Sequence, residues 1–201
     1  WRLRELVVTG LIASVSPGSV GMERLRAELD AVAGRRDIGL QAGDVRRALS
    51  DLPDDSPFPA PLALNVVPVV GTTREDGWTT LERKFADELR KVLDLPDLAV
   101  MATFVQVPVV TNHSLSVHAT FQRRVVVERA RQALVEAPEI VALDADGEYP
   151  TPIDSVGVDP RFVGRVRQDP QHPHTLDLFI CADSLRRGAG ALVRTAELLV
   201  A

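Results

Sequence analysis

Residues Val105–Val117, VQVPVVTNHSLSV, are the most informative stretch of the sequence for the fold. The four valines at the start of the stretch form a β-branched apolar run, which predicts a buried strand. Pro108 has no backbone N–H to donate, so it favours an edge position or a bulge. Asn112, His113 and Ser114 follow the run, at what we expect to be a strand exit where side chains can hold chemistry. By periodicity alone, His113 fits a loop or core histidine better than a functional one.

The rest of the chain alternates between helical and strand patterns. Ala99–Val109 is expected to be the central strand, and Leu62–Val70 a second buried strand. Thr79–Leu93 is the clearest helix, capped by Thr79 or Thr80. Further strands are expected at 6–9, 116–121, 140–143, 163–167 and 176–181, and further helices at 20–34, 41–52, 128–136 and 183–199. This pattern predicts one α+β domain over residues 1–201, with a mixed, mostly antiparallel sheet packed with helices.

Composition narrows the class of protein. The 201 residues are 45% hydrophobic and 25% charged, which is typical of a globular domain. A net charge of −5 gives no electrostatic footprint for nucleic acid or an anionic membrane, and no apolar run approaches the ~20 residues that span a bilayer. The single cysteine, Cys181, suits a reducing cytoplasm. Because the chain begins at Trp1 within a strand pattern, we expect it to be the back part of a longer protein.

The chain does not contain a self-sufficient active site. It has no GxSxG motif, and Cys181 lies within an apolar strand pattern, so we interpret it as a buried structural thiol. His172 and His174 lie in a polar turn without further ligands, so no metal site is expected. A histidine, a lysine and arginines suit proton transfer and a small anionic substrate. The remaining candidates are His113, Gln106, Lys84, Glu82, Arg165 and Arg167.

Several stretches together resemble the C-terminal half of the aspartate-semialdehyde dehydrogenase family. They are LALNVVPVVG (62–71), ERKFADELRKVL (82–93), VQVPVVTNHSLSV (105–117), EYPTPIDSVGVDP (148–160), VGRVRQDP (163–170) and ADSLRRGAG with AELL (182–199). They occur in the family order and cover nearly the whole chain. The resemblance implies a catalytic and dimerisation domain that forms homodimers, with an NADP-binding Rossmann domain and its nucleophilic cysteine upstream of Trp1.

The resemblance also implies roles for individual residues. His113 matches the family's acid/base histidine, Lys84 matches a lysine that helps to bind anionic ligands, and Glu82 matches a glutamate in the same helix motif. No cofactor is expected for this chain alone, since most of the NADP site belongs to the other half.

Departures from the family pattern concern the site itself. The arginine that clamps the substrate carboxylate falls on Gln106, and a glutamine of the catalytic region falls on Ile12. The cysteine that commonly precedes this strand motif is Phe104, and the family's asparagine has no clear equivalent in GAGALVR (188–194). These changes resemble the Usg-type paralogues, which keep the fold and lack key catalytic residues.

Three functions therefore stay open. The first is a dimerising Usg-type paralogue with impaired or no catalysis. The second is the substrate domain of an active enzyme with altered specificity, in which Gln106 contacts a neutral or smaller acyl group while His113 and Lys84 keep their roles. The third is a domain that only pairs with itself, with a structural His113.

Overall fold

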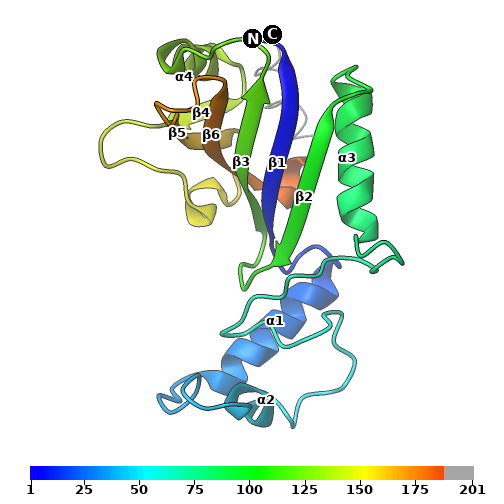
Figure 1. Cartoon of the computed structure of the whole chain (residues 1–201). Helices are drawn as coiled ribbons and strands as arrows, with labels where there is room; N and C mark the ends of the chain where they lie inside the picture. Colours follow the sequence, from blue (N-terminus) through cyan, green and yellow to red (C-terminus); the bar gives the residue numbers. More distant parts are fainter. Residues whose placement is uncertain (188–201) are drawn as a thin grey trace.

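A computed structural model describes residues 1–187 and contains one six-stranded sheet in the order β2-β1-β3-β6-β5-β4 (Figure 1). β1 pairs with β2, and β4 with β5, in parallel, whereas the other three pairs are antiparallel. The predicted α+β class with a mixed, mostly antiparallel sheet is therefore confirmed. The strands are β1 (Leu3–Ile12), β2 (Ala99–Gln106), β3 (Asn112–Phe121), β4 (Ile140–Leu143), β5 (Arg161–Arg167) and β6 (Thr175–Asp183).

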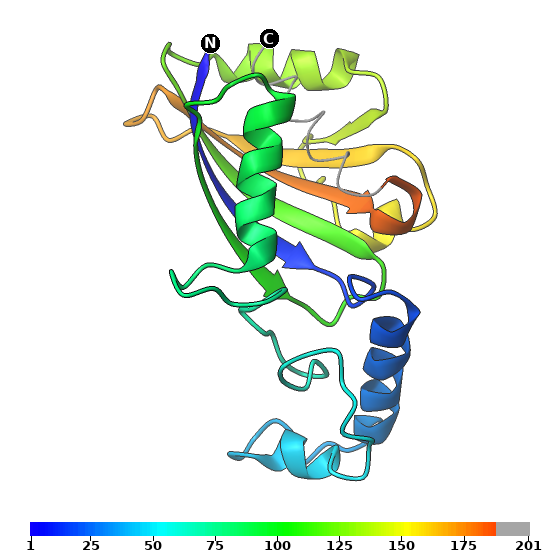
Figure 2. The ribbon, with the colours of Figure 1, turned by 90° about the vertical axis from the view of Figure 1, so that its right-hand side faces the viewer.

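Two helices, α3 and α4, cover one face of the sheet, and Figure 2 shows α3 lying across it. The main core fills the space between this face and the helices, with Phe85 and Leu89 of α3 and Leu134 of α4 among its buried residues. The helices are α1 (Ser19–Val32), α2 (Asp44–Ala48), α3 (Thr80–Val92), α4 (Val127–Glu136) and α5 (Ser184–Arg187), with a 3₁₀ turn η1 at Pro152–Ser155. Within residues 1–187, no helix is long and apolar enough to cross a membrane.

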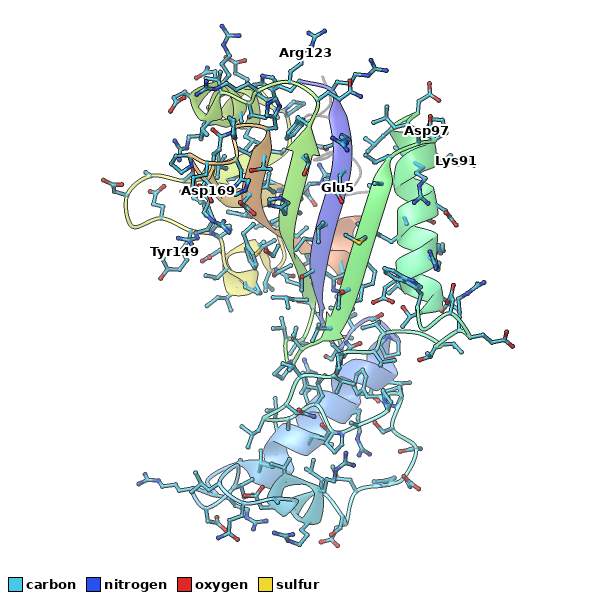
Figure 3. All side chains as sticks on the ribbon, viewed as in Figure 1. Glu5, Lys91, Asp97, Arg123, Tyr149 and Asp169 are labelled. Atoms are coloured by element: carbon cyan, nitrogen blue, oxygen red, sulfur yellow. The ribbon has the colours of Figure 1, made fainter. Side chains whose placement is uncertain are left out.

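The opposite face of β1, β2 and β3 carries no α-helix among the described residues, although the 3₁₀ turn η1 packs on it at the start of β3 (Figure 1). Away from η1 its side chains are half-buried or exposed, such as Val7 and Leu11 of β1 and Met101 of β2, which is 48% exposed. Glu5 also lies on this face, which is turned towards the viewer in Figure 3. We call it the open face.

The helix predicted at Thr79–Leu93 is present as α3, and its beginning is explained by a capping box. The Thr79 hydroxyl accepts from the Glu82 N–H, while the Glu82 carboxylate accepts from the Thr79 N–H. Two N–H groups that have no partner within the helix are satisfied in this way.

The expected central strand is at the edge of the sheet. β2 ends at Gln106, before Pro108, and has a named strand, β1, on one side only. The chain then crosses over the end of β1 to begin β3 at Asn112. Asn112, His113 and Ser114 therefore lie at a strand entry, and the predicted exit is wrong. Of the two signals in this stretch, the apolar run favoured a central strand and Pro108 favoured an edge. The proline was correct, since it has no N–H to donate to a neighbouring strand.

The strand predicted at Leu62–Val70 is also wrong. Only Val67 forms an isolated bridge, to Gln106, and Leu64 has a positive φ of 57°. Pro61 and Pro68 remove backbone donors that a buried strand needs. The apolar residues belong to a small second core instead, in which Leu62 and Val67 pack with Leu25 of α1 and with Phe58.

This second core belongs to a projection formed by α1, α2 and residues 49–70, which extends beyond the end of the sheet (Figures 1 and 2). Glu28 of α1 is fully buried, and its carboxylate accepts from the Leu62 and Ala63 N–H groups and from Arg24. The buried charge is therefore satisfied, and it ties the helix to the irregular segment.

Two predicted helices differ in length from the structure. The helix predicted at 41–52 is only the short α2, because the Asp44 carboxylate accepts from the N–H groups of Gly39, Leu40 and Gln41 and so holds a turn before it. The helix predicted at 183–199 begins as α5, and its remainder lies outside the described residues.

Candidate functional site

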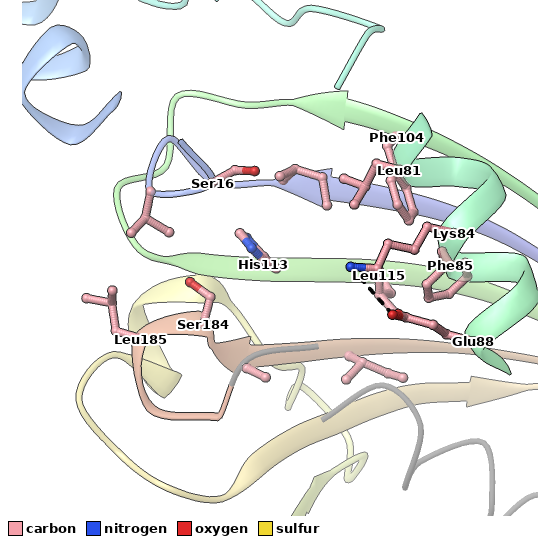
Figure 4. A pocket seen from close by; sticks show the side chains of 14 residues that line it. Ser16, Leu81, Lys84, Phe85, Glu88, Phe104, His113, Leu115, Ser184 and Leu185 are labelled. Atoms are coloured by element: carbon pink, nitrogen blue, oxygen red, sulfur yellow. Dashed lines mark ion pairs between the residues drawn. The ribbon is translucent and has the colours of Figure 1, made fainter. Parts of the chain in front are cut away.

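A cavity of about 350 Å³ lies between α3 and the helix-covered face of β1, β3 and β6 (Figure 4). Its apolar lining residues are Ile12, Val15, Leu81, Phe85, Phe104, Leu115, Ile180, Ala182 and Leu185. Its polar lining residues are Ser16, Lys84, Glu88, His113 and Ser184. The cavity is in the size range of small-molecule sites, which are mostly apolar with a few converging polar groups.

His113 reaches the cavity because of its position in β3. Side chains alternate along a strand, so His113 shares the helix-covered face with Leu115, whereas Asn112 and Ser114 point to the other side. The backbone N–H of Ala13 donates to Nδ1 of His113 at 3.1 Å. Because that N–H can only donate, Nδ1 is the unprotonated nitrogen and the ring proton of the neutral form is on Nε2.

The electrostatic environment keeps this histidine neutral. Burial lowers the pKa of His113 below its ordinary value of 6.5, and the carboxylate of Asp183 opposes only part of this shift. Protonating Nδ1 would also remove the acceptor that Ala13 uses. His113 is therefore a neutral imidazole near pH 7, able to donate one hydrogen bond or proton through Nε2.

Lys84 lies on the α3 wall of the same cavity, so the structure brings it together with His113 (Figure 4). Its ammonium group is 3.6 Å from the Glu88 carboxylate, one turn further along the helix, and both side chains are exposed. The cavity wall therefore has one cation and one anion in contact with each other.

Gln106 does not line the cavity. It is only 3% exposed, and its amide nitrogen donates to the carbonyl oxygens of Ile12 (3.0 Å) and Ala13 (2.7 Å). Both amide hydrogens are thus used by the main chain after β1. Because Ala13 in turn donates to His113, Gln106 holds the segment that orients the histidine.

Glu82 also lies outside the cavity lining. One carboxylate oxygen accepts from the Thr79 N–H at 2.8 Å, and the other accepts from the Phe104 N–H at 3.0 Å. The side chain is buried and satisfied by main-chain donors, so it fastens the first turn of α3 to β2.

The polar residues that point away from the cavity hold η1 in place. Asn112 donates to the Pro152 carbonyl and to the Ser155 hydroxyl, and the Asp183 carboxylate accepts from the Gly157 N–H. The conformation of the proline-rich 150–157 segment therefore depends on the ends of β3 and β6.

The other candidates lie elsewhere. Cys181 is fully buried 3.3 Å from the Ser114 hydroxyl, and burial raises the pKa of its thiol to about 11, which confirms the buried structural thiol. His172 contacts Asp169 in an exposed turn, and no group of three metal-binding side chains occurs within residues 1–187. Arg165 and Arg167 are exposed on β5 and do not line the cavity.

Sequence reasoning missed Glu88, Ser16 and Ser184 of the cavity lining. Glu88 had a signal, because it lies one turn after Lys84 on the same helix. The two serines had none, since each reaches the cavity only when the ends of β1 and β6 come together.

Comparison with known proteins gives a consistent result. Residues 1–187 match the protein family described as "Semialdehyde dehydrogenase, dimerisation domain". The chain is 36% identical to the aspartate-semialdehyde dehydrogenase of Corynebacterium melassecola, over 98% of this chain and 57% of that protein. It is 35% identical to the enzyme of the same name from Mycolicibacterium smegmatis, over 99% and 57%. The chain therefore spans a little over half the length of these curated relatives.

Among solved structures, the fold is similar to that of aspartate semialdehyde dehydrogenase II from Vibrio cholerae, complexed with ASA. The TM-score is 0.80 with 27% identity, covering 98% of this chain and 55% of that one.

Proposed function

Because the chain belongs to the semialdehyde dehydrogenase family, as its C-terminal dimerisation domain, we propose that it serves as the dimerisation and substrate domain of an aspartate-semialdehyde dehydrogenase-like protein with impaired or no catalysis on aspartyl substrates, as in the Usg-type paralogues. In this proposal its main role is to pair two copies of the protein.

The environment of Gln106 is the observation that supports impaired catalysis. The family resemblance puts the arginine that clamps the substrate carboxylate at this position. Gln106 has no charge, and its amide hydrogens are already donated to the Ile12 and Ala13 carbonyl oxygens. Losing a charge-assisted bidentate contact costs roughly 1.5–3 kcal/mol, on the order of 10- to 100-fold in binding.

An activity assay of the full-length protein tests this proposal. We expect little or no phosphate-dependent oxidation of aspartate semialdehyde with NADP⁺. Gln106→Arg should raise any kcat/KM by ~10- to 100-fold, because a guanidinium restores the charge and its five N–H donors can serve both carbonyls and a substrate carboxylate. Gln106→Met is the uncharged control and should give no gain. A wild-type kcat at the ordinary enzyme level, about 10 s⁻¹, would refute impaired catalysis.

A second candidate is a working enzyme with altered substrate specificity. It is supported by His113, which is neutral and lines the cavity with Nε2 as its proton donor. If the protein turns over another aldehyde or acyl compound, His113→Ala should lower that turnover by ~100-fold or more. Turnover unaffected by the substitution would leave His113 a structural residue.

The open face is our proposed surface for homodimerisation. Beside polar residues such as Glu5 and Thr9, this face presents the apolar side chains of Val7, Leu11 and Met101. A second copy of the chain would cover these residues from the solvent. Light scattering at micromolar concentration should give twice the monomer mass.

The NADP site is proposed to belong to a Rossmann domain encoded upstream of Trp1. The described cavity does not suit a cofactor phosphate, since its one lysine is in contact with Glu88. Sequencing the coding region upstream is the direct test. A Rossmann pattern with the usual cysteine would favour the enzyme, and one without it would favour the paralogue. We also propose that the protein is cytoplasmic, because a chain with a single cysteine, which cannot form an internal disulfide, suits a reducing compartment.

A further inference from the structure

A histidine and an aspartate form a pair within the open face. His118 of β3 and Asp177 of β6 are directly opposite each other in the register, and Nδ1 of His118 is 2.9 Å from the Asp177 carboxylate. Their side chains are 43% and 27% exposed, so water reaches both in the free protomer. Because a carboxylate can only accept, Nδ1 of His118 carries a proton, and the proton that the ring gains on acidification is on Nε2.

This pair lies inside the surface proposed above for homodimerisation. On the β1 side, His118 is directly opposite Val7, one of the apolar residues that a second copy would cover. Opposite residues of an antiparallel pair have Cβ atoms about 5 Å apart, so a partner that covers Val7 also removes water from His118. The matched family is described as a dimerisation domain, which favours a second copy of the chain as that partner.

The charged groups around His118 make the cost of this burial depend on pH. Among the described residues, two carboxylates flank it on this face, those of Glu5 on β1 and Asp177 on β6. Arg167 of β5 is opposite Asp177, and it points away from the core because Val166 before it is a core residue. One guanidinium thus faces two carboxylates when His118 is neutral, and protonation of His118 balances them. Burying an unpaired carboxylate is unfavourable, whereas a hydrogen-bonded ion pair offsets part of the lost hydration.

We propose that the open face is a pH-dependent surface for self-association, in which protonation of His118 beside Asp177 favours the dimer. This inference deepens the dimerisation role proposed above and rests on it. Histidine is the side chain whose charge ordinarily changes between pH 5 and 8, so the effect belongs to that range. The dimer is favoured towards pH 6, where each copy brings a balanced set of charges to the interface, and it is weakened towards pH 8.

Sedimentation equilibrium of the full chain at pH 6, pH 7 and pH 8, at constant ionic strength, tests the inference. The dissociation constant of the dimer should rise ~10-fold or more from pH 6 to pH 8, because each dimer buries two such pairs. Aspartate and glutamate side chains are ordinarily ionised throughout this range, so they add no pH dependence of their own.

Three variants identify the groups responsible. His118→Gln keeps a hydrogen-bond donor without a titrating ring, and should make the dissociation constant independent of pH within about twofold. Asp177→Asn leaves the imidazolium without its anion, and should abolish the rise towards pH 8 or reverse it. His172→Gln is the matched control, because His172 is paired with Asp169 at 3.1 Å in the exposed turn between β5 and β6, and it should keep the full pH dependence.

The outcomes separate this inference from the proposed function. A dimer with the same dissociation constant at pH 6 and pH 8, or a pH dependence that persists in His118→Gln, would overturn the inference and leave homodimerisation intact. A wild-type monomer at all three pH values would overturn homodimerisation as well. A dependence that is lost in His118→Gln and kept in His172→Gln would support the inference.

Discussion

The two faces of the sheet differ in what covers them, and the candidate functions follow that difference. The helix-covered face carries the main core, the cavity and His113. The open face carries exposed and half-buried side chains such as Val7 and Met101 over β1 and β2. Our proposals thus assign ligand binding to one face and self-association to the other.

The contrast is sharpest within β3, where one residue of register separates the two roles. His113 points into the cavity, while its neighbours Asn112 and Ser114 point to the other side, towards η1 and Cys181. A shift by one residue would exchange these positions. Three adjacent polar residues therefore differ in role: His113 lines the cavity, whereas Asn112 and Ser114 make structural contacts on the other side.

The largest effect is expected from a substitution that leaves a cavity in the core beneath the helix-covered face. Phe121 is 2% exposed in the main core. Its ring packs edge-on against that of Trp1, with the two ring centroids 6.1 Å apart. Phe121→Ala should lower the free energy of unfolding by about 3–5 kcal/mol, measured by urea denaturation at fixed protein concentration. Thr120→Ala, on the other face of the same strand, should cost within about 0.5 kcal/mol. Equal losses would contradict the assigned faces.

A charge on the open face should break the proposed dimer. Val7→Glu would bury an unpaired carboxylate in the interface, so the dissociation constant should rise ~100-fold or more, about 2.7 kcal/mol. Sedimentation equilibrium measures it. Val92→Glu, at a 44%-exposed position on α3, is the control and should leave the dimer intact. A wild-type monomer, or a Val7→Glu dimer of unchanged affinity, would place the interface elsewhere.

The end of the open face next to η1 is covered, and the raised pKa of the Cys181 thiol there reflects this burial. The native thiol has a pKa of about 11 against 9.0 for an ordinary thiol, so the unfolded chain ionises first as the pH rises. Stability from this group is fully present below pH 9 and should fall by about 2–3 kcal/mol between pH 9 and 11. Urea denaturation across this range, compared with Cys181→Ala, measures the difference. Parallel curves for the two proteins would show an accessible thiol.

The smallest effect is expected for a polar pair on the open face. His118 of β3 and Asp177 of β6 are 2.9 Å apart, with side chains 43% and 27% exposed. Because water screens such a pair in the free protomer, its coupling energy in a double-mutant cycle of His118→Ala and Asp177→Ala, measured below the dissociation constant of the dimer, should stay below about 1 kcal/mol and decrease with salt. A larger coupling would mean that the pair is covered, as a tight dimer across it would cause.

Local signals in the sequence predicted the elements they belong to. The cap at Thr79 and the apolar face of the following helix gave α3 within a residue, and the strand at Ile140–Leu143 is found with the predicted bounds. The Leu62–Val70 strand failed because apolar composition does not distinguish a strand from an irregular segment that fills a second core. The alternation of side chains along β3 predicted on which face of the strand His113 lies. It did not predict that the Ala13 N–H would donate to the ring.

The sequence by itself determined the family, the α+β class and most helices and strands, because caps, proline and side-chain alternation act within a few residues. Only the tertiary structure decided that Gln106 and Glu82 bind main-chain groups, and that Lys84 and His113 share a cavity. The contact from Ala13 to His113 joins residues 100 positions apart. Such contacts form only when burial of the whole core offsets the entropy of closing long loops, so no local pattern encodes them.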